Sequence, residues 1–432
     1  MRTFAFLLTA LFFSAITFQA VAETTYLTAD ALMDMRSGKL IAYPVVIIEN
    51  GEISAVGTAG DLPRPADATF IDLGGKTILP GLIDMHVHLA SSPTVRGYRA
   101  LGVSQHRHTI MGVVAAKKTL ASGFTTVRNA GADAFMDVAL RDAIAEGEIP
   151  GPRMFVSGPP VGITGGHCSD NNLLPPEYDD RGENVADGPW AMREKVRRNI
   201  KYGVDFIKTC STGGVFSKGT TLGAAQGTAE ELTAIVEEAH ARGLKVASHA
   251  HGTIGIKNAL RAGVDTIEHA SFLDDEAIRI AKRNGVYFSM DIYNTEYTLA
   301  EGEKNGVLEE SLRKEREVGA IQRESFTMAV KAGAKVVFGS DAAIYPHGDN
   351  AKQFSRMVRF GMTPLQAVRA ATTLAAEALG QSEHLGVIAP GYAADIIAVE
   401  GDPLSDVSVL EHVDFVMKDG IVYKQDAAPI PK

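Results

Sequence analysis

Four histidines and one aspartate stand at the ends of short β-branched segments, where their side chains could bind metal. His86 and His88 form an H-x-H pair, while His249, His269 and Asp341 each end a segment of their own. Side chains alternate along a strand, so His86 and His88 face the same side and can hold one ion. An isolated H-x-H pair is weak evidence, since loop histidines also match it. Four segments that all end in ligand-type side chains are harder to explain by packing.

Lys208 lies within the apolar segment 205–210, where a lysine is costly to bury without a partner. A salt bridge to an inward carboxylate would satisfy it. The ammonium group itself cannot bind a metal, because its nitrogen has no free lone pair. A buried lysine loses its proton readily, and the neutral amine reacts with carbon dioxide to give a carbamate, whose two oxygens can bridge two cations. With that bridge, the six side chains would form a two-metal site.

These residues belong to a repeating pattern of short strands and longer helical stretches between about residues 80 and 380. Eight strands are predicted, at Leu82–His86, Thr125–Arg128, Met154–Ser157, Phe206–Cys210, Lys245–His249, Thr266–His269, Tyr287–Asp291 and Val336–Asp341. Helical periodicity is clearest over 229–242 and 323–332. Four glycines are placed to close helices, namely Gly243, Gly263, Gly285 and Gly333. The pattern predicts a (β/α)8 TIM-like barrel, with the candidate ligands on its C-terminal face, and a doubly wound sheet is the alternative.

The two ends of the chain carry a different pattern of short strands with turn signals. Asn50-Gly51 separates two apolar runs, which is a strong hairpin signal. Further strand-like runs follow at 394–399 and 415–422. We therefore expect a small composite β-sandwich domain built from residues 23–79 and 381–432, with a catalytic barrel over 80–380.

The first 22 residues are typical of a secretory signal. Arg2 precedes the apolar stretch 4–18, and Ala20-Val21-Ala22 is a small-x-small cleavage site. A retained membrane anchor is the alternative, although the stretch is short for a spanning helix. Cleavage near Ala22 predicts a periplasmic or secreted protein, and no later apolar run predicts membrane association.

Charge and cysteine content narrow the possible partners. The chain has 432 residues, with 42 Lys and Arg against 52 Asp and Glu, a net charge of −10. This balance argues against nucleic-acid binding, which needs a basic surface. Cys168 and Cys210 are the only cysteines. They could pair, but both stand beside candidate site residues, so packing around the site is the preferred interpretation.

The chain resembles the amidohydrolase superfamily, and within it the binuclear dipeptidases of the prolidase-like branch that cleave Xaa-Pro or Xaa-Arg/Lys peptides, close to the ochratoxin-type amidases. The resemblance rests on five motifs, at 79–88, 207–208, 248–252, 268–269 and 339–341. It implies two divalent metal ions, with zinc preferred. The implied ligands are His86, His88 and Asp341 for one ion, His249 and His269 for the other, and Lys208 as the bridging carbamate.

The resemblance also implies a reaction. A metal-bridging hydroxide would attack the amide bond of a dipeptide or N-acyl amino acid and release the C-terminal amino acid, with Asp341 carrying the proton to the leaving nitrogen. His167, His251 and Tyr293 match positions that contact the substrate, and His251 is also a catalytic candidate. A small substrate with a free carboxylate and a homo-oligomeric assembly are expected.

Other functions of the same fold stay open at this point. An amidase of a non-peptide N-acyl amino acid, such as an ochratoxin-type toxin, would share every residue named above, and a lactonase is hard to exclude because the same nucleophile attacks esters. Lys208 argues against a mononuclear deaminase. The presence of all six candidate ligands argues against a catalytically silent assembly protein.

Overall fold

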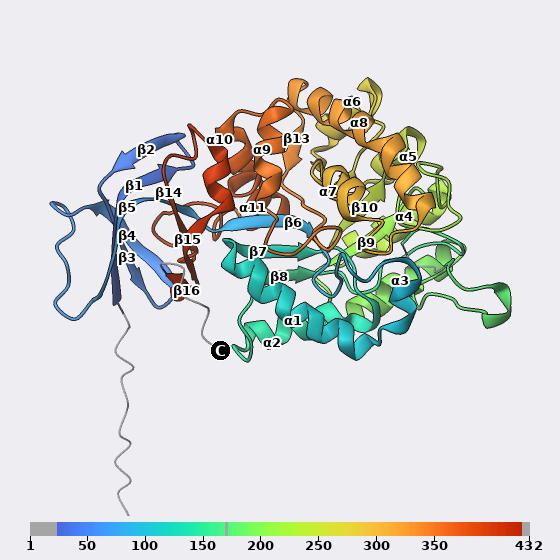
Figure 1. Ribbon diagram of the computed structural model, residues 1–432, viewed down its shortest axis with the longest axis horizontal. Coiled ribbons are helices and arrows are strands. Elements are labelled where there is room, and N and C mark those ends of the chain that lie inside the picture. The colour runs from blue at the N-terminus through green and yellow to red at the C-terminus, as the bar shows by residue number, and fades with distance from the viewer. Residues whose placement is uncertain (1–23, 169–171, 426–432) are drawn as a thin grey trace, which may run out of the picture.

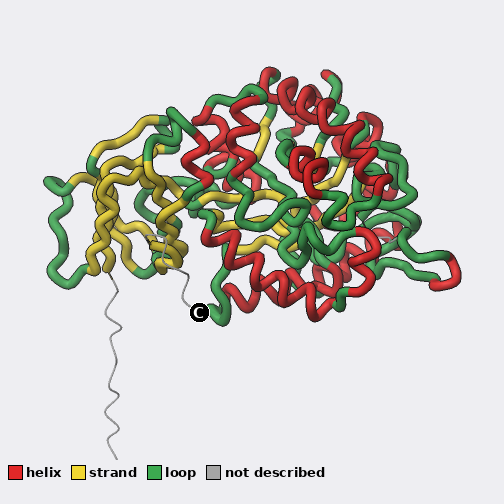
Figure 2. Tube along the Cα trace, viewed as in Figure 1, coloured by secondary structure: helices red, strands yellow, loops and turns green. Residues whose placement is uncertain are grey.

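The protein has a mixed α/β fold, seen here in a computed structural model that describes residues 24–168 and 172–425. The expected signal segment lies outside the described residues. Figure 1 shows a sheet made from both chain ends on one side, and the helices with the remaining strands on the other. Figure 2 shows the same division, because the strands of the chain ends gather apart from most of the helices.

The sheet at the chain ends joins N-terminal and C-terminal strands. Its strand order is β16-β15-β14-β5-β1-β3-β4, with β2 paired to β1. The N-terminal strands are β1 (Thr24–Asp34), β2 (Lys39–Ala42), β3 (Pro44–Glu49), β4 (Glu52–Thr58) and β5 (Thr69–Pro80), and the C-terminal ones are β14 (Ile396–Glu400), β15 (Val413–Lys418) and β16 (Ile421–Gln425). The ends meet where β14 runs antiparallel to β5, with Ile396 opposite Pro80. Leu27, Val46 and Phe415 are buried in the core of this sheet.

The predicted hairpin at Asn50-Gly51 is present. Strands β3 and β4 pair antiparallel, with Glu49 opposite Glu52. Asn50 and Gly51 both have positive φ, 53° and 83°. A two-residue turn of this kind needs positive φ at both central positions, which explains why this dipeptide stands there.

All eight predicted central strands are present, in two parallel sheets. Strands β6 (Leu82–Val87), β7 (Phe124–Asn129) and β8 (Arg153–Val156) form one sheet, and β9 (Phe206–Cys210), β10 (Lys245–Ala250), β11 (Thr266–His269), β12 (Tyr287–Ser289) and β13 (Lys335–Val337) form the other. Three of them end earlier than predicted, β8 by one residue, β12 by two and β13 by four. Asp291 and Asp341 therefore lie in the segments that follow β12 and β13, rather than on the strands.

The two parallel sheets contact each other at both edges. On one edge, the backbone N of Val161 donates to the carbonyl of Lys208 at 2.9 Å, and Val161 pairs with Thr209 in a parallel bridge. On the other edge, Val87 pairs with Ala342 in a second parallel bridge. These contacts bring the carboxyl ends of β6, β9 and β13 towards one region.

Helices follow most of the central strands. They are α1 (Gln105–Ala121), α2 (Met136–Ala145), α3 (Pro189–Lys201), α4 (Ala229–His240), α5 (Thr253–Ala262), α6 (Asp275–Asn284), α7 (Asn294–Glu301), α8 (Glu309–Lys331), α9 (Lys352–Arg359), α10 (Pro364–Ala370) and α11 (Thr373–Leu379). Short 3-10 helices lie at Gly97–Gly102, Asp133–Phe135, Pro176–Tyr178 and Val407–Glu411. Helix α4 begins at the predicted residue and ends two residues earlier than predicted, whereas the predicted helix 323–332 is the last part of the longer α8. Within the described ranges, no helix has the length and apolar character that a membrane crossing requires.

The predicted glycine positions explain where several helices end. Gly263 and Gly285 are the left-handed C-caps of α5 and α6, with φ of 96° and 73°. Gly243 and Gly333 also have positive φ just beyond α4 and α8. A residue with a Cβ would be strained at these positions. Each glycine thus lets the chain turn from a helix into the next parallel strand.

Candidate active site

A cavity of about 320 Å³ opens where the central strands end. All six predicted metal ligands line it, namely His86, His88, Lys208, His249, His269 and Asp341. They come from strands β6, β9, β10 and β11 and from the segments that follow β6 and β13. Residues separated by as many as 255 positions in the chain therefore meet at one cavity wall.

His86, His88 and Asp341 form the first group of candidate ligands. The Nε2 atoms of His86 and His88 are 3.2 Å apart, and the Oδ1 atom of Asp341 lies 3.6 Å and 3.3 Å from them. Three ligand atoms that converge in this way, two imidazole nitrogens and a carboxylate oxygen, suit a divalent metal ion.

A buried charge network orients His86 from behind. Its Nδ1 atom lies 3.0 Å from Oε2 of Glu268, which is fully buried. Glu268 in turn accepts hydrogen bonds from Arg128 and Thr266, each at 2.6 Å. A carboxylate behind a metal-ligating histidine fixes the ring and its tautomer. The network therefore presents Nε2 of His86 to the cavity.

His249, His251 and His269 form the second group, with one ligand atom of each within 4.8 Å of the others. The Nδ1 atom of His269 lies 2.7 Å from Oδ1 of Asp291, so Nε2 faces the cavity. The Nε2 atom of His249 is buried and has no hydrogen-bond partner in the described part of the chain. An unpartnered buried polar atom is costly, and a bound metal ion would satisfy it.

Burial favours the neutral form of His86, His249 and His251, the form of imidazole that binds metal. Burial lowers the pKa of His86 to about 4, and Lys208 adds to the effect. Burial and the neighbouring histidines hold the pKa of His249 well below its usual value. His269 is different, because its partner Asp291 outweighs the effect of burial and raises the pKa.

The backbone is turned sharply at two of the candidate ligands. His269 and Asp341 both adopt left-handed conformations, with φ of 69° and 54°. Such conformations are uncommon for residues other than glycine and cost about 1–3 kcal/mol, so the surrounding structure must enforce them. They aim both side chains into the cavity, His269 from the last residue of β11 and Asp341 from the segment that follows β13.

Lys208 lies in the middle of β9 and is buried. Burial lowers the pKa of its ammonium group to about 8, although the carboxylate of Glu268 favours the charged form. A minor fraction of the amine is therefore neutral near neutral pH, far more than for an exposed lysine. This is the protonation state that carbamate formation needs.

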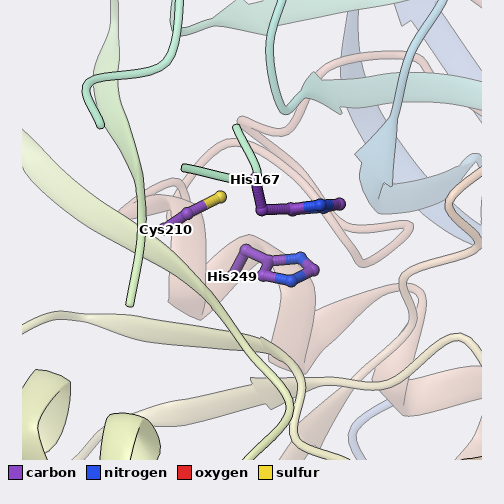
Figure 3. A group of neighbouring side chains, drawn as sticks. All are labelled: His167, Cys210 and His249. Atoms are coloured by element: carbon purple, nitrogen blue, oxygen red, sulfur yellow. The ribbon is translucent and has the colours of Figure 1, made fainter. Parts of the chain in front are cut away.

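Cys168 and Cys210 correct one sequence-based interpretation, because they form a disulfide across 42 residues, with Cα atoms 5.7 Å apart. Figure 3 shows His167 and His249 lying next to Cys210. These three residues could otherwise be a further metal group. A thiolate is the form of cysteine that binds metal, so the disulfide removes the sulfur ligand from this group.

The structure brings two of the three predicted substrate contacts to the cavity. The ring of His167 stacks on that of His249 at 4.1 Å, and its Nδ1 atom lies 2.8 Å from Ser217 Oγ. His251 has its Nδ1 atom 2.7 Å from Ser271 Oγ. In both cases the serine occupies one ring nitrogen and leaves the other for a substrate.

Tyr293 is placed differently from its prediction. Among the described residues that line the cavity, Tyr293 is absent. Its ring packs against Tyr345 at 4.8 Å and under the guanidinium of Arg356 at 4.7 Å. The residue caps the start of α7, which turns its side chain into these packing contacts.

Sequence reasoning missed several residues that shape the site. Two of them could have been identified from the sequence. Glu268 directly precedes the candidate ligand His269, and Asp291 ends a predicted strand, as the candidate ligands do. No sequence feature identifies Arg128, because its hydrogen-bond partners, Met85, Thr266 and Glu268, lie on other strands. Arg96 stands on the loop between β6 and α1, and spacing along the sequence cannot show which residues of a loop face inwards.

The cavity thus gathers a histidine-rich set of candidate metal ligands at the carboxyl ends of parallel strands. The sequence profile of the amidohydrolase family matches residues 77–422. The chain belongs to this family, and it is a hydrolase that acts on carbon–nitrogen bonds.

Relatives of this chain share most of its length. It is 31% identical to ochratoxinase from Aspergillus niger over 426 residues, covering 93% of this chain and 87% of that protein. A Xaa-Pro dipeptidase crystallised with methionine in its active site is 37% identical, with a TM-score of 0.88 and coverage of 93% of this chain and 100% of that one. A prolidase in complex with N-methylphosphonate-L-proline is 32% identical, with a TM-score of 0.84 and the same coverage.

Proposed function

We propose that the protein is an exo-acting amide hydrolase that releases the C-terminal amino acid from dipeptides or N-acyl amino acids. One observation carries the proposal, the convergence of two candidate ligand groups and a buried lysine on one cavity. The similarity to a Xaa-Pro dipeptidase and to an ochratoxinase supports this choice of substrate class. A bulky N-acyl amino acid is the second candidate substrate, favoured by the ochratoxinase match.

The parallel strands fit the closed (β/α)8 barrel that the sequence predicts. The contacts of Val161 with Lys208 and of Val87 with Ala342 support closure, because they join the two sheets at both edges. In such a barrel the active site lies at the carboxyl ends of the strands. The cavity lies at those ends.

The donor set fits two divalent metal ions, for which we favour zinc. The proposed ligands are His86, His88 and Asp341 for one ion, His249 and His269 for the other, and Lys208 as a carbamate between them. When bound, such ions polarise the amide carbonyl and lower the pKa of water. The Nε2 atoms that converge in the cavity and the unpartnered Nε2 of His249 support this assignment.

Side chains of the cavity would transfer the proton and orient the substrate. Asp341 accepts a proton from the attacking water and returns it to the leaving nitrogen, which requires the carboxylate form. Its pKa is held well below the usual range by His86 and His88, despite burial. We assign His251 the tautomer with its proton on Nε2, so that Nδ1 accepts from Ser271, 2.7 Å away, and Nε2 donates to the amide carbonyl. His167, held in the same way by Ser217, orients the acyl side of the substrate.

Export of the protein to the periplasm or the medium is part of the proposal. The pattern of the first 22 residues supports it. The disulfide between Cys168 and Cys210 also supports it, because disulfides persist in oxidising compartments. The homo-oligomeric state stays a prediction.

Metal content and product release test the proposed function together. The zinc-loaded protein is expected to hold about two ions per chain and to release free amino acids from a panel of dipeptides and N-acyl amino acids. A strong chelator should abolish the activity, and zinc should restore it. Full activity with about one ion per chain would overturn the two-metal assignment. Failure to release an amino acid from any member of the panel would overturn the substrate class.

A substitution behind the second ligand group gives a separate prediction. Asp291→Asn removes the charge that orients His269, so zinc affinity should fall about 10- to 100-fold. Competition with a chromophoric chelator measures this affinity. Asp265→Asn is the matched control, because Asp265 also contacts a histidine, His240 at 2.9 Å, but does not line the cavity. Equal zinc affinity in the two variants would contradict the assignment of His269 as a ligand.

A further inference from the structure

Arg96 is a cationic side chain of the cavity wall that the proposed chemistry does not use. It precedes the 3-10 helix Gly97–Gly102 and lines the same cavity as the candidate ligands. Its Nη2 atom donates to the backbone carbonyl of Ala343, and its guanidinium lies over the ring of Phe216 at 5.4 Å. Both contacts hold the guanidinium in one place, and neither neutralises its charge.

Against the effect of burial, the carboxylate of Asp341 favours the charged form of Arg96, but it does not pair with the guanidinium directly. The guanidinium forms no ion pair with any residue of the described ranges, and its Nε atom has no hydrogen-bond partner there. Burial lowers its pKa to about 10, so it stays protonated at neutral pH. A partly buried cation without an anion is unfavourable, unless a ligand supplies the anion.

Carboxylate is the anion that this group suits best. A guanidinium is planar and presents parallel N–H donors that match the two oxygens of a carboxylate. Among the described residues that line the cavity, Lys208 is the other side chain of lysine or arginine type. Because Lys208 is assigned to the metal bridge, Arg96 is left as the permanent cation for a substrate.

The position of Arg96 agrees with the geometry of the reaction. In an N-acyl amino acid, one carbon separates the leaving nitrogen from the free carboxylate. The receptor for the carboxylate must therefore lie beside the residue that protonates this nitrogen. Arg96 is bonded to Ala343, two residues after Asp341, so both groups are held by the same short segment.

We propose that Arg96 binds the free α-carboxylate of the amino-acid part of the substrate and so makes the enzyme specific for C-terminal residues. The inference rests on the proposed function and deepens it. Phe216 and the carbonyl of Ala343 keep the guanidinium in its binding orientation. An amide or ester at the same position lacks the negative charge and would leave Arg96 unpaired.

Kinetics with a matched pair of substrates test the role of Arg96. The wild-type enzyme should prefer N-acetyl-L-methionine to N-acetyl-L-methioninamide, and Arg96→Met should lower kcat/KM for the acid about 10- to 100-fold while leaving the amide nearly unchanged. For the acid, Arg96→Lys should have a kcat/KM between those of the wild type and Arg96→Met, because lysine keeps the charge but not the paired donors. Arg99→Met is the control on the same loop, since Arg99 is exposed and does not line the cavity.

Binding of a product separates this inference from the proposed function. L-methionine should bind the wild-type holoprotein more tightly than L-methioninol, which has no carboxylate, and Arg96→Met should remove the difference in calorimetry. This result would support the role of Arg96 even if no tested amide were hydrolysed. The role of Arg96 would be overturned if Arg96→Met weakened the binding of both ligands equally. It would also be overturned if Arg96→Met, with zinc content and melting temperature preserved, still bound L-methionine more tightly than L-methioninol.

Discussion

Lys208→Ala is expected to reduce the metal content from about two ions per chain to one or fewer, and to lower activity on the order of 10³-fold or more. The lysine is buried in β9, lines the same cavity as both groups of candidate ligands and affects the pKa of a histidine in each group. Its own lowered pKa permits the neutral amine that forms a carbamate. Metal analysis by mass spectrometry and initial rates would measure the two effects.

Two further variants separate loss of a ligand from loss of the fold. Lys208→Arg keeps a long cationic side chain but cannot form the carbamate, so it should fail like the alanine variant. Lys245→Ala removes a lysine from the neighbouring strand β10, whose Nζ donates to the carbonyl of Ala378, and it should keep both ions. Propionate should partly restore Lys208→Ala by supplying two oxygens. Wild-type metal content in Lys208→Ala would remove the bridge from the proposal.

The sequence was sufficient to predict the central strands because their positions depend on local signals. Runs of β-branched residues mark the strands, and glycines such as Gly263 and Gly285 mark where helices end. Strand ends were harder to place, since β12 and β13 stop when the backbone turns towards the cavity. The full length of α8 was also missed, because its first half is rich in charged residues and has a weak apolar period.

The candidate ligands could be predicted for a related reason. Parallel strands carry their carboxyl ends to one face, so His249 and His269 could be placed together without knowledge of the packing. Contacts made through tertiary structure could not be placed in this way. The disulfide between Cys168 and Cys210 depends on where the loop that carries Cys168 crosses β9. The orientation of the Tyr293 side chain depends on its packing against Tyr345 and Arg356.

Asp341→Asn is expected to lower kcat about 10²- to 10⁴-fold while zinc content is largely preserved. The amide keeps an oxygen near His86 and His88, so it can still contribute to metal binding. It cannot accept the proton of the attacking water, and so it cannot pass this proton to the leaving nitrogen. Pre-steady-state rates, expressed per zinc-loaded site, would separate the chemical step from any loss of metal.

A control and an altered leaving group sharpen this prediction. Asp349→Asn changes an aspartate on the same segment that contacts Lys352 and does not line the cavity, so its rate should be unchanged. Substrates with a more acidic leaving group depend less on protonation, so they should recover part of the rate in Asp341→Asn. If the variant lost equal rate on every leaving group, Asp341 would act on water alone, and proton delivery would belong to another side chain, with His251 the first candidate.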